Sequence, residues 1–347
     1  MQKRYCCDSD CGSHGPVLPV GVKLVASSAA VATSLYVFYF LTQLMGPIVA
    51  GIQWILDFIW PSAGLYDVDA NKVLGFTIPV VAIIPTVLLA SILERKRPIE
   101  NHDTQEARAT IRTEWMLVAF MATIGIFVQI VLFVVFGRAT MVVGGPLFYL
   151  EAESVFGSMV LVIAYALYID CAKYWMHRLP HMIPLLWAIH SFHHSAERLT
   201  VATGARHHWA EKILLVPLVL LTLMLFQVPA HIMAMAVLLM NVPDALQHLN
   251  YKIAWHRVGI WVNTPQWHRI HHSVEPKHYD KNFSSAFPIM DVIFGTAHRP
   301  APDEYPETGL RPRENPQLWE GIIWPFREWL GPRREPYMGA PRPDADL

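Results

Sequence analysis

The chain has 347 residues, of which 53% are hydrophobic and only 16% are charged. A soluble domain carries about 25% charged residues, so the composition points away from an ordinary soluble domain. The formal net charge of −1 provides no basic surplus and argues against nucleic acid as a partner. Thirteen of the 17 histidines fall between His177 and His272, and this concentration calls for an explanation of its own.

Residues 1–21 are predicted to be a cytoplasmic N-terminal tail. They lack the apolar core and the cleavage site of a signal peptide. Their cysteines, together with His14, could bind a metal or accept a lipid, but a disordered tail is the favoured interpretation. The cysteines of the whole chain form neither a disulfide framework nor a Cys-rich zinc pattern. They are Cys6, Cys7, Cys11 and Cys171.

Residues 22–154 are predicted to be an N-terminal transmembrane region. Residues 24–45, 73–93 and 115–136 carry no charge over 22, 21 and 22 residues, and a spanning helix needs about 20 apolar residues. A shorter run, 155–169, leads into the first histidine-rich segment. Residues 213–240 form a longer apolar run that is interrupted at Val228-Pro229. We expect this run to be a helical hairpin that enters and leaves on one side, or two short tilted helices.

Basic residues in the short loops predict the orientation of these spans. Five of them lie in the loop 94–114, whereas the loops on either side hold only Lys72 and Arg138. The excess of positive charge places this loop, and with it the N-terminus, on the cytoplasmic side. Counting spans from there puts every histidine cluster on the cytoplasmic face. The predicted fold is therefore all-α, a polytopic integral membrane helix bundle with a cytoplasmic His-rich metal-binding cap.

Residues 300–347 are predicted to be a Pro-rich, mostly irregular C-terminal tail, with ten prolines in 48 residues. One aromatic patch, over 318–330, interrupts it. The patch could lie at the level of the lipid headgroups, and packing on the cytoplasmic cap is an equally good interpretation.

Four histidine-rich segments have the spacing of metal ligands, because residues three or four apart share one helix face. Nine imidazoles and one carboxylate exceed the needs of one ion and suit two ions with four or five ligands each. Neutral imidazole suits iron, zinc, copper and nickel, and the HExxH pattern of zinc proteases is absent. The candidate ligands are the nine histidines His177, His181, His190, His193, His194, His248, His268, His271 and His272, with Asp244 as an optional tenth ligand.

The remaining histidines have simpler interpretations. His14, His102, His278 and His298 are expected to be exposed. His231 lies inside the apolar hairpin and is expected to bond a backbone carbonyl rather than a metal. His208 and His256 are left undecided.

The residues around the histidines resemble those of the fatty acid hydroxylase/sterol desaturase superfamily of integral membrane di-iron enzymes. The resemblance covers residues 156–299, within a predicted catalytic domain over 155–299. The matching residues are Tyr174, Trp175, His177, Arg178 and His181; Trp187, His190, His193, His194 and Ser195; Arg206, His207 and Glu211; Gln247, His248 and Asn250; Thr264, Pro265, Trp267, His268, His271 and His272; Asp280, Lys281, Asn282 and Phe283; and Phe287, Pro288, Asp291, Phe294, Gly295 and Thr296.

The resemblance implies an O₂-dependent attack on an unactivated C–H bond of a fatty acyl chain, a sterol or another membrane lipid. Two iron ions would be the cofactor, with zinc possible in purified samples, and a separate ferredoxin or cytochrome-type donor with a reductase would supply electrons. A desaturase and an ether-lipid monooxygenase are alternatives on the same scaffold. A membrane zinc-binding protein is a distant alternative, because transporters need polar groups within the spans and the runs 24–45, 73–93 and 115–136 contain no Asp, Glu, Lys, Arg or His.

Four further residues are expected to support the metal ligands rather than bind the metals: His207, Glu211, Asp170 and Asn282. The segment from Arg206 to Glu211 lacks a proline that the family usually has there. Asp244 could bind a metal directly or through water, or orient His248. The basic residues Arg178, Arg198 and Arg206 could meet a lipid headgroup or form ion pairs with Glu197 and Glu211.

Overall fold

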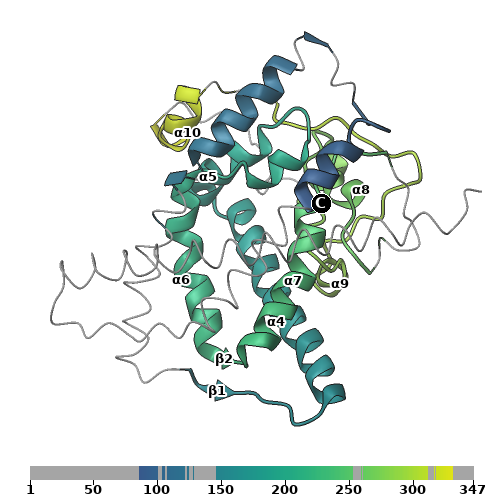
Figure 1. Cartoon of the computed structure of the whole chain (residues 1–347). Helices are drawn as coiled ribbons and strands as arrows, with labels where there is room; N and C mark the ends of the chain where they lie inside the picture. The colour runs from purple at the N-terminus through teal and green to yellow at the C-terminus, as the bar shows by residue number, and fades with distance from the viewer. Residues whose placement is uncertain are drawn as a thin grey trace, which may run out of the picture. The chain divides into compact units, whose positions relative to one another are not determined.

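The structure is a computed structural model that describes residues 86–100, 104–105, 108–121, 123–124, 128, 146–252, 259, 261–311, 316 and 318–330 (Figure 1). Several sequence-based predictions lie outside these residues and stay predictions. They concern the N-terminal tail with its cysteines, the span at 24–45, most of the span at 73–93, His14, His102, His256 and the chain beyond Leu330.

The longest described helix, α4 (Val155–Met182), carries the first two histidines at its C-terminal end. It begins where the Ser154 side chain accepts a hydrogen bond from the backbone N–H of Gly157, 3.0 Å away. The apolar run predicted to end at residue 169 continues as one helix through Pro180, two residues before the helix ends. Among the described helices, α4 alone has the length and apolar composition to span a membrane.

The apolar run 213–240 folds as two antiparallel helices. Helix α6 (Trp209–Leu225) is followed by the two-residue strand β2 (Phe226–Gln227), and helix α7 (Ala230–Leu246) returns after Pro229. Strand β1 (Phe148–Tyr149) pairs in parallel with β2 at the turn of this hairpin (Figure 1). Two helices with a break between them agree with the sequence-based expectation, and whether they form a one-sided hairpin or two tilted helices in a membrane stays a prediction.

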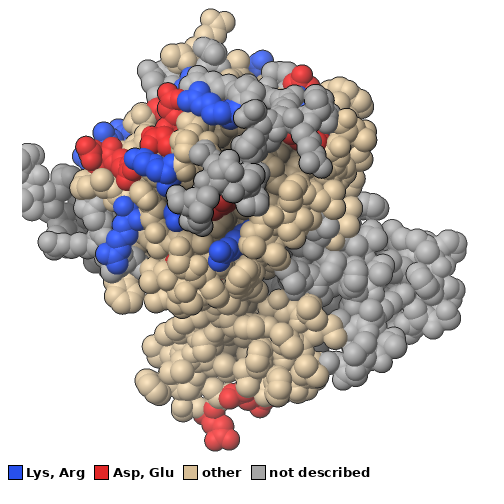
Figure 2. Space-filling model, turned by 180° about the vertical axis from the view of Figure 1, so that it is seen from behind, with Lys and Arg blue, Asp and Glu red and all other residues tan. Residues whose placement is uncertain are grey.

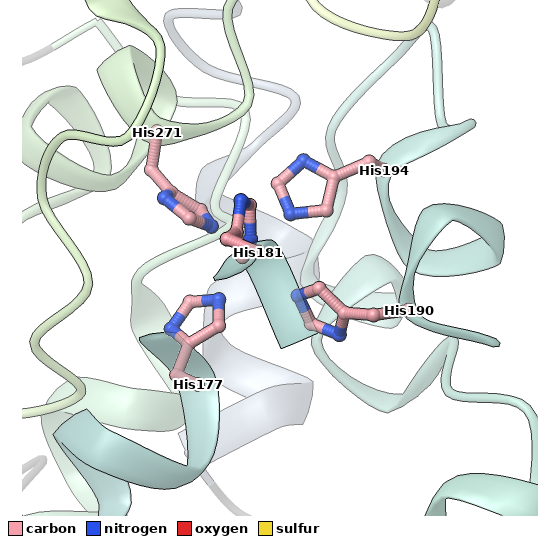
Figure 3. Close-up of side chains that lie close together, drawn as sticks. All are labelled: His177, His181, His190, His194 and His271. Carbon is pink, nitrogen blue, oxygen red and sulfur yellow. The ribbon is translucent and has the colours of Figure 1, made fainter. Parts of the chain in front are cut away.

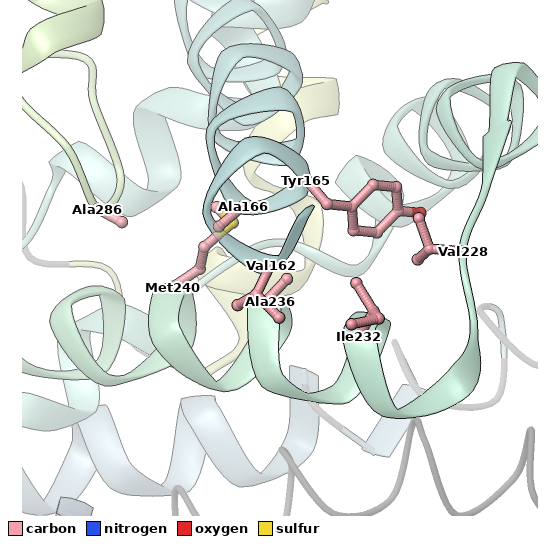
Figure 4. Close-up of a cluster of buried hydrophobic side chains, with 8 residues drawn as sticks. All are labelled: Val162, Tyr165, Ala166, Val228, Ile232, Ala236, Met240 and Ala286. Atoms are coloured by element: carbon pink, nitrogen blue, oxygen red, sulfur yellow. The ribbon is translucent and has the colours of Figure 1, made fainter. Parts of the chain in front are cut away.

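Helices α4 and α7 pack closely because small residues lie at their contact. Ala166 of α4 and Ala236 of α7 are fully buried, and Tyr165, Ile232 and Met240 close the space around them (Figure 4). The phenol group of Tyr168 donates a hydrogen bond to the carbonyl of Thr222, which fixes α4 against α6. These three helices therefore form the scaffold from which the histidines project.

Short elements lie toward the end of the molecule opposite β1 and β2, and two of them, α5 and α8, carry five of the candidate histidines (Figure 1). Their shortness follows from the sequence, since prolines begin several of them and prolines are tolerated in the first turn of a helix. In chain order they are α5 (Pro184–His194), the 3₁₀ helix η3 (Val201–Ala205), α8 (Pro265–His271), the 3₁₀ helix η4 (Pro276–His278) and α9 (Ile289–Ile293).

Helix α10 (Leu318–Leu330) contains the aromatic patch and packs on α5. Trp324 is buried, and its indole N–H donates to the Ser191 hydroxyl over 2.9 Å. Trp319 and Leu330 remain exposed. The buried side chain of Trp324 agrees with the interpretation that the aromatic patch packs on the histidine-bearing part of the molecule.

Charge is distributed unevenly over the surface. In Figure 2 the upper part of the molecule carries the blue and red side chains, whereas the lower part is tan down to a red lower tip. Many large apolar side chains of α4 are exposed, among them Phe156, Met159 and Ile163. An apolar belt of this kind is what a membrane-facing surface requires.

Candidate metal centre

The structure brings all nine candidate histidines together in two groups. In each group, one ring nitrogen from every histidine lies within 4.8 Å of the others. The first group, shown in Figure 3, combines α4, α5 and α8 and consists of His177, His181, His190, His194 and His271. The second lies beside it and consists of His193, His248, His268 and His272.

The rings of the first group are held by hydrogen bonds on their outer side. His177 Nδ1 donates to the carbonyl of Phe283 over 2.8 Å, and His271 Nδ1 donates to the carbonyl of Lys281 over 2.9 Å. A carbonyl can only accept, so Nδ1 carries the proton and Nε2 keeps its lone pair. Both Nε2 atoms are buried without a hydrogen-bond partner and face the other rings (Figure 3).

The second group converges on His248. Its Nε2 lies 3.2 Å from His193 Nε2, 3.2 Å from His272 Nε2 and 3.0 Å from His268 Nε2. Neutral imidazole has one N–H, so hydrogen bonds cannot satisfy four nitrogens that meet at one point. Ligand nitrogens about 2.1 Å from one ion are separated by roughly 3.0–3.4 Å, which matches these spacings.

The protonation of the cluster also suits metal binding. Burial lowers the pKa of His248 and of His271 to about 3. Burial likewise holds the pKa of His193, His268 and His272 well below 6.5, so these rings are neutral at pH 7. Metal ligands must be deprotonated. The Nε2 atoms without partners in the first group, the four Nε2 atoms that meet in the second, and the neutral rings therefore fit a pair of metal ions.

Glu211, at the first turn of α6, supports the cluster from outside. It accepts hydrogen bonds from His190 Nδ1 at 2.9 Å and from His207 Nδ1 at 2.7 Å. Burial alone would raise the pKa of this carboxyl, but the electrostatic interaction and hydrogen bonds with His207 and His190 hold the pKa well below its usual value. The His207 ring stacks on His193 with 4.3 Å between centroids. Both residues lie where supporting groups were predicted.

Asp244 lies apart from both histidine groups. Its carboxylate pairs with Lys173 at 3.0 Å and accepts a hydrogen bond from Gln247 at 2.9 Å. Neither histidine group includes this carboxylate, although the i, i+4 spacing to His248 is as predicted. The alternative in which Asp244 binds a metal directly has no support in this geometry.

Asp170 and Asn282 were expected to support the ligands directly, but in the structure they form hydrogen bonds with backbone groups instead. Asp170 accepts hydrogen bonds from the N–H groups of Ala286 and Phe287, both at 3.0 Å. Asn282 donates to the carbonyl of Trp267 at 2.9 Å and accepts from the N–H of His298 at 2.7 Å. Their effect on the rings is indirect, because they fix the loop whose carbonyls bond His177 and His271.

Asp291 is a buried residue that positions the loop beside the histidines, and it does not belong to the spacing pattern of the candidate ligands. It accepts hydrogen bonds from the N–H groups of Phe283 and Ser284 at 2.7 and 3.1 Å. It also accepts from the indole N–H of Trp267 at 3.2 Å and from the hydroxyl of Thr296 at 2.8 Å. Its place in the family motif was the one sequence signal for this role.

Two predictions for the outlying histidines need correction. His278 was expected to be exposed but is fully buried, because its ring bonds the hydroxyl of Ser273 at 2.8 Å and Glu304 at 3.0 Å. His298, expected to be exposed, is partly covered and lies 3.3 Å from the same carboxylate. His208, left undecided, is buried and caps α6, and His231 is exposed near the start of α7.

Two of the arginines that could have met a lipid headgroup have other contacts in the structure. Arg206 is 2% exposed and lies over the ring of Phe192, 4.7 Å from its centroid, so it cannot meet a headgroup. Burial lowers its pKa, while Glu114 and Glu197 raise it. Arg178 donates to the phenol oxygen of Tyr174 at 3.1 Å.

A cavity of about 530 Å³ connects the apolar helices to the histidines. Its apolar wall comes from α4 and α7 and includes Ile169, Met176, Met233 and Val237. Its other end is formed by histidines of both groups, with Lys173 and Asp244 at the side. Such a cavity suits a ligand with an apolar chain and a few polar groups.

Comparison with protein families gives one match in this region. The sequence model of the fatty acid hydroxylase family matches residues 162–296, which contain all nine clustered histidines. No solved structure matches the chain significantly.

Curated proteins of several lipid pathways are similar to the chain. Alkylglycerol monooxygenase of Danio rerio is 31% identical over 132 residues, which cover 37% of this chain and 28% of that protein. Ornithine lipid hydroxylase OlsE of Rhizobium tropici is 28% identical over 137 residues, or 40% of this chain and 41% of that protein. Methylsterol monooxygenase erg25A of Aspergillus fumigatus is 24% identical over 254 residues, or 71% and 81%. The chain thus spans under a third of the alkylglycerol monooxygenases that it matches.

Proposed function

Because the chain belongs, through residues 162–296, to the fatty acid hydroxylase/sterol desaturase superfamily, we propose that it is a membrane-bound lipid hydroxylase with a dinuclear iron centre. The observation that carries the proposal is the meeting of nine buried histidines in two groups at the end of an apolar cavity. The reaction would consume O₂, two electrons and two protons, insert one oxygen atom into a C–H bond and release water.

Each histidine group would hold one ion. The first offers five imidazoles and the second four, and every one of these rings has a buried nitrogen without a hydrogen-bond partner. When bound, the iron pair would supply O₂ activation and oxidation of the C–H bond. An all-imidazole set also accepts zinc, which is the metal expected in samples prepared without added iron.

The chain's own residues would position the ions and the lipid. Glu211 and the carbonyls of Phe283 and Lys281 fix the ring tautomers so that Nε2 faces the ions. The apolar wall of α4 and α7 would exclude water and guide a hydrocarbon chain toward the histidines. The Lys173–Asp244 pair lies beside this path and would meet the polar end of the lipid.

The alternative with the most specific support is an ether-lipid monooxygenase, since alkylglycerol monooxygenases are among the similar proteins. Hydroxylation of the carbon next to an ether oxygen gives a hemiacetal, which splits into an aldehyde and an alcohol. A desaturase would instead remove two hydrogens.

The proposed setting is an integral, multi-pass membrane protein with the metal centre on the cytoplasmic side. Its support is the apolar helix α4, the exposed apolar surface and the basic loop 94–114. A separate ferredoxin or cytochrome-type donor with a reductase would supply the electrons.

Lipid analysis tests the proposal. The chain is expressed with a reductase system, and total lipids are compared by mass spectrometry with and without O₂. Gain of one oxygen supports hydroxylation, an aldehyde supports ether cleavage, and loss of two hydrogens supports desaturation. Unchanged lipids together with zinc as the only bound metal, even after growth with added iron, would rule out the oxygenase.

Matched histidine variants link the activity to the cluster. His271→Ala is expected to abolish lipid oxidation while leaving membrane insertion intact, because it removes a ring of the first group. His231→Ala, which changes an exposed histidine of α7, is the control and should retain activity. Turnover by His271→Ala would show that this ring does not hold the metal.

A further inference from the structure

A second pocket lies outside the histidine site. It has a volume of about 860 Å³ and is formed by the helical segments 86–93 and 108–121 with the residues that follow the first. Its described lining residues are Ser91, Glu94, Arg95, Pro98, Arg108, Ile111, Arg112, Trp115 and Thr200. None of these residues lines the cavity next to the histidines.

Three arginines converge on this pocket from two segments. Arg108 and Arg112 are four residues apart and share one helix face, while Arg95 follows the end of the other segment. All three are exposed, and no residue in the described part of the chain forms an ion pair with any of them. Like charges that share a pocket repel, so the arrangement is stabilised by a bound anion.

Glu94, the acid among the described lining residues, forms no ion pair with the arginines. Glu94 is buried, and one of its oxygens accepts hydrogen bonds from the N–H groups of Val201 at 2.7 Å and of Asn250 at 3.0 Å. Thr200 likewise donates its hydroxyl to Glu114, at 3.2 Å. These polar groups are used in holding the segment 200–203, so that among the described lining residues the guanidinium groups are the ones available to bind a ligand.

The same two segments expose apolar side chains next to the arginines. Trp115 is 43% exposed, and tryptophan is enriched where membrane and water meet. The other exposed apolar residues on the two segments are Leu88, Leu89, Ile92, Met116 and Phe120. The pocket therefore lies at the border between an apolar surface and a basic one, which is the level of lipid headgroups.

We propose that this pocket binds the phosphate group of an anionic membrane phospholipid. The guanidinium group matches phosphate through paired N–H donors, and the adjoining apolar side chains would contact the acyl chains. The proposal rests on the membrane setting of the proposed function but not on its oxidation chemistry. It assigns a lipid site separate from the cavity that would admit a substrate.

Native mass spectrometry of the full chain in detergent tests the proposal. The protein is titrated with phosphatidylglycerol, with phosphatidylcholine and with inorganic phosphate. The pocket variant Arg95→Gln/Arg108→Gln/Arg112→Gln is compared with Lys96→Gln/Arg97→Gln/Arg299→Gln, which removes the same charge from exposed positions that do not line the pocket.

The wild type and the control variant are expected to bind phosphatidylglycerol at least about tenfold more tightly than the pocket variant, since three charge-assisted contacts are lost in the latter. Equal binding by all three proteins overturns the proposal, as does equal binding of phosphatidylcholine and phosphatidylglycerol. If the protein binds inorganic phosphate but not phosphatidylglycerol, the proposal that the ligand is a phospholipid is overturned.

Metal content and lipid oxidation, measured on the same variants, separate this proposal from the enzymatic one. A pocket variant that loses phosphatidylglycerol but keeps its metal supports the lipid site whether or not the chain proves to be a hydroxylase. If the enzyme is active but the wild type and the pocket variant bind phosphatidylglycerol equally, only the proposed lipid site is overturned.

Discussion

At the residue scale, Glu211 positions two different rings, because each of its two oxygens accepts a hydrogen bond from one of them. One oxygen accepts from His190 Nδ1 and the other from His207 Nδ1. The first bond directs His190 Nε2 toward the first histidine group, and the second keeps His207 stacked on His193 of the second group. A single carboxylate therefore organises both halves of the candidate metal centre.

Glu211→Gln is expected to weaken metal binding about 10- to 100-fold, the usual effect of removing a partner of a metal-bound histidine. The amide cannot accept from both rings as the carboxylate does. Metal retained after dialysis against a chelator, measured by elemental analysis, checks this. Glu153→Gln, on the exposed loop before α4, is the control. Equal retention by both variants would contradict the role of Glu211.

A glycine in η3 gives a second test at this scale. A Cβ added at Gly204 would lie 3.2 Å from His248 Nδ1, tighter than ordinary van der Waals contact. Gly204→Ala should therefore displace His248 and lower the metal content of the second group, with two metal ions per chain falling toward one. Elemental analysis measures the ratio, and an unchanged ratio would show that the ring can move without loss.

At the scale of elements, the centre depends on loops that are tied together by buried acids. Asp291 of α9 holds the backbone at Phe283, whose carbonyl fixes His177, and it bonds Trp267 of α8. Asp170 ties α4 to the same loop through Ala286. The histidines of α4 and α8 thus keep their relative position because these carboxylates span the elements.

Asp291→Ala is expected to destabilise the protein by more than about 3 kcal/mol, since it leaves several buried N–H donors without acceptors at about 1–3 kcal/mol each. Thermal unfolding in detergent measures the loss. Asp303→Ala, at an exposed position of the following segment, should change stability by less than about 0.5 kcal/mol. A variant as stable as the wild type would contradict the role given to Asp291.

The contact between α10 and α5 can be tested with one methyl group. A Cβ at Gly321 would lie 2.9 Å from Leu117 and 3.0 Å from Phe192. Gly321→Ala should cost about 1–3 kcal/mol by overpacking, whereas Trp319→Ala changes an exposed side chain of the same helix and should cost little. If both variants unfold at the same temperature as the wild type, the packing of α10 is not as described.

At the scale of the whole molecule, the buried histidines couple stability to pH. Burial holds the pKa of His248 and His271 at about 3 in the folded chain, against 6.5 for an unperturbed histidine. Below pH 6.5 the unfolded chain therefore takes up protons that the folded chain does not. This favours unfolding, so stability is lost as the pH falls.

The metal-free protein is expected to lose up to about 1.4 kcal/mol per pH unit for each such histidine between pH 6.5 and 4. Thermal unfolding at several pH values measures the slope. His248→Gln/His271→Gln should make the slope shallower, because two of the buried histidines that give rise to it no longer titrate. A melting temperature that does not change over this range would contradict the burial of neutral rings.

Much of the candidate site could be predicted from local spacing. The i, i+4 pair at His177 and the two HxxHH clusters specify which side chains share a helix face, and the structure brings all nine histidines together. The break of the apolar run at Val228-Pro229 was predictable for a similar reason, since proline interrupts the interior of a helix and is tolerated at its start. These features depend on neighbours within one or two helical turns.

Other features were decided only by the tertiary structure. The spacing of Asp244 to His248 is right for a ligand, yet Lys173, 71 residues away in sequence, takes its carboxylate. His278 is buried because Glu304 comes within 3.0 Å from a later loop, and half of the aromatic patch is covered because Ser191 and Phe192 lie beneath it. The division of nine rings into five and four also depends on how α4, α5 and α8 meet. The sequence by itself determined which residues have the spacing of metal ligands and which runs are apolar, because both are local properties. The tertiary structure decided the hydrogen-bond and ion-pair partners of these polar side chains, because the partners are distant in the chain.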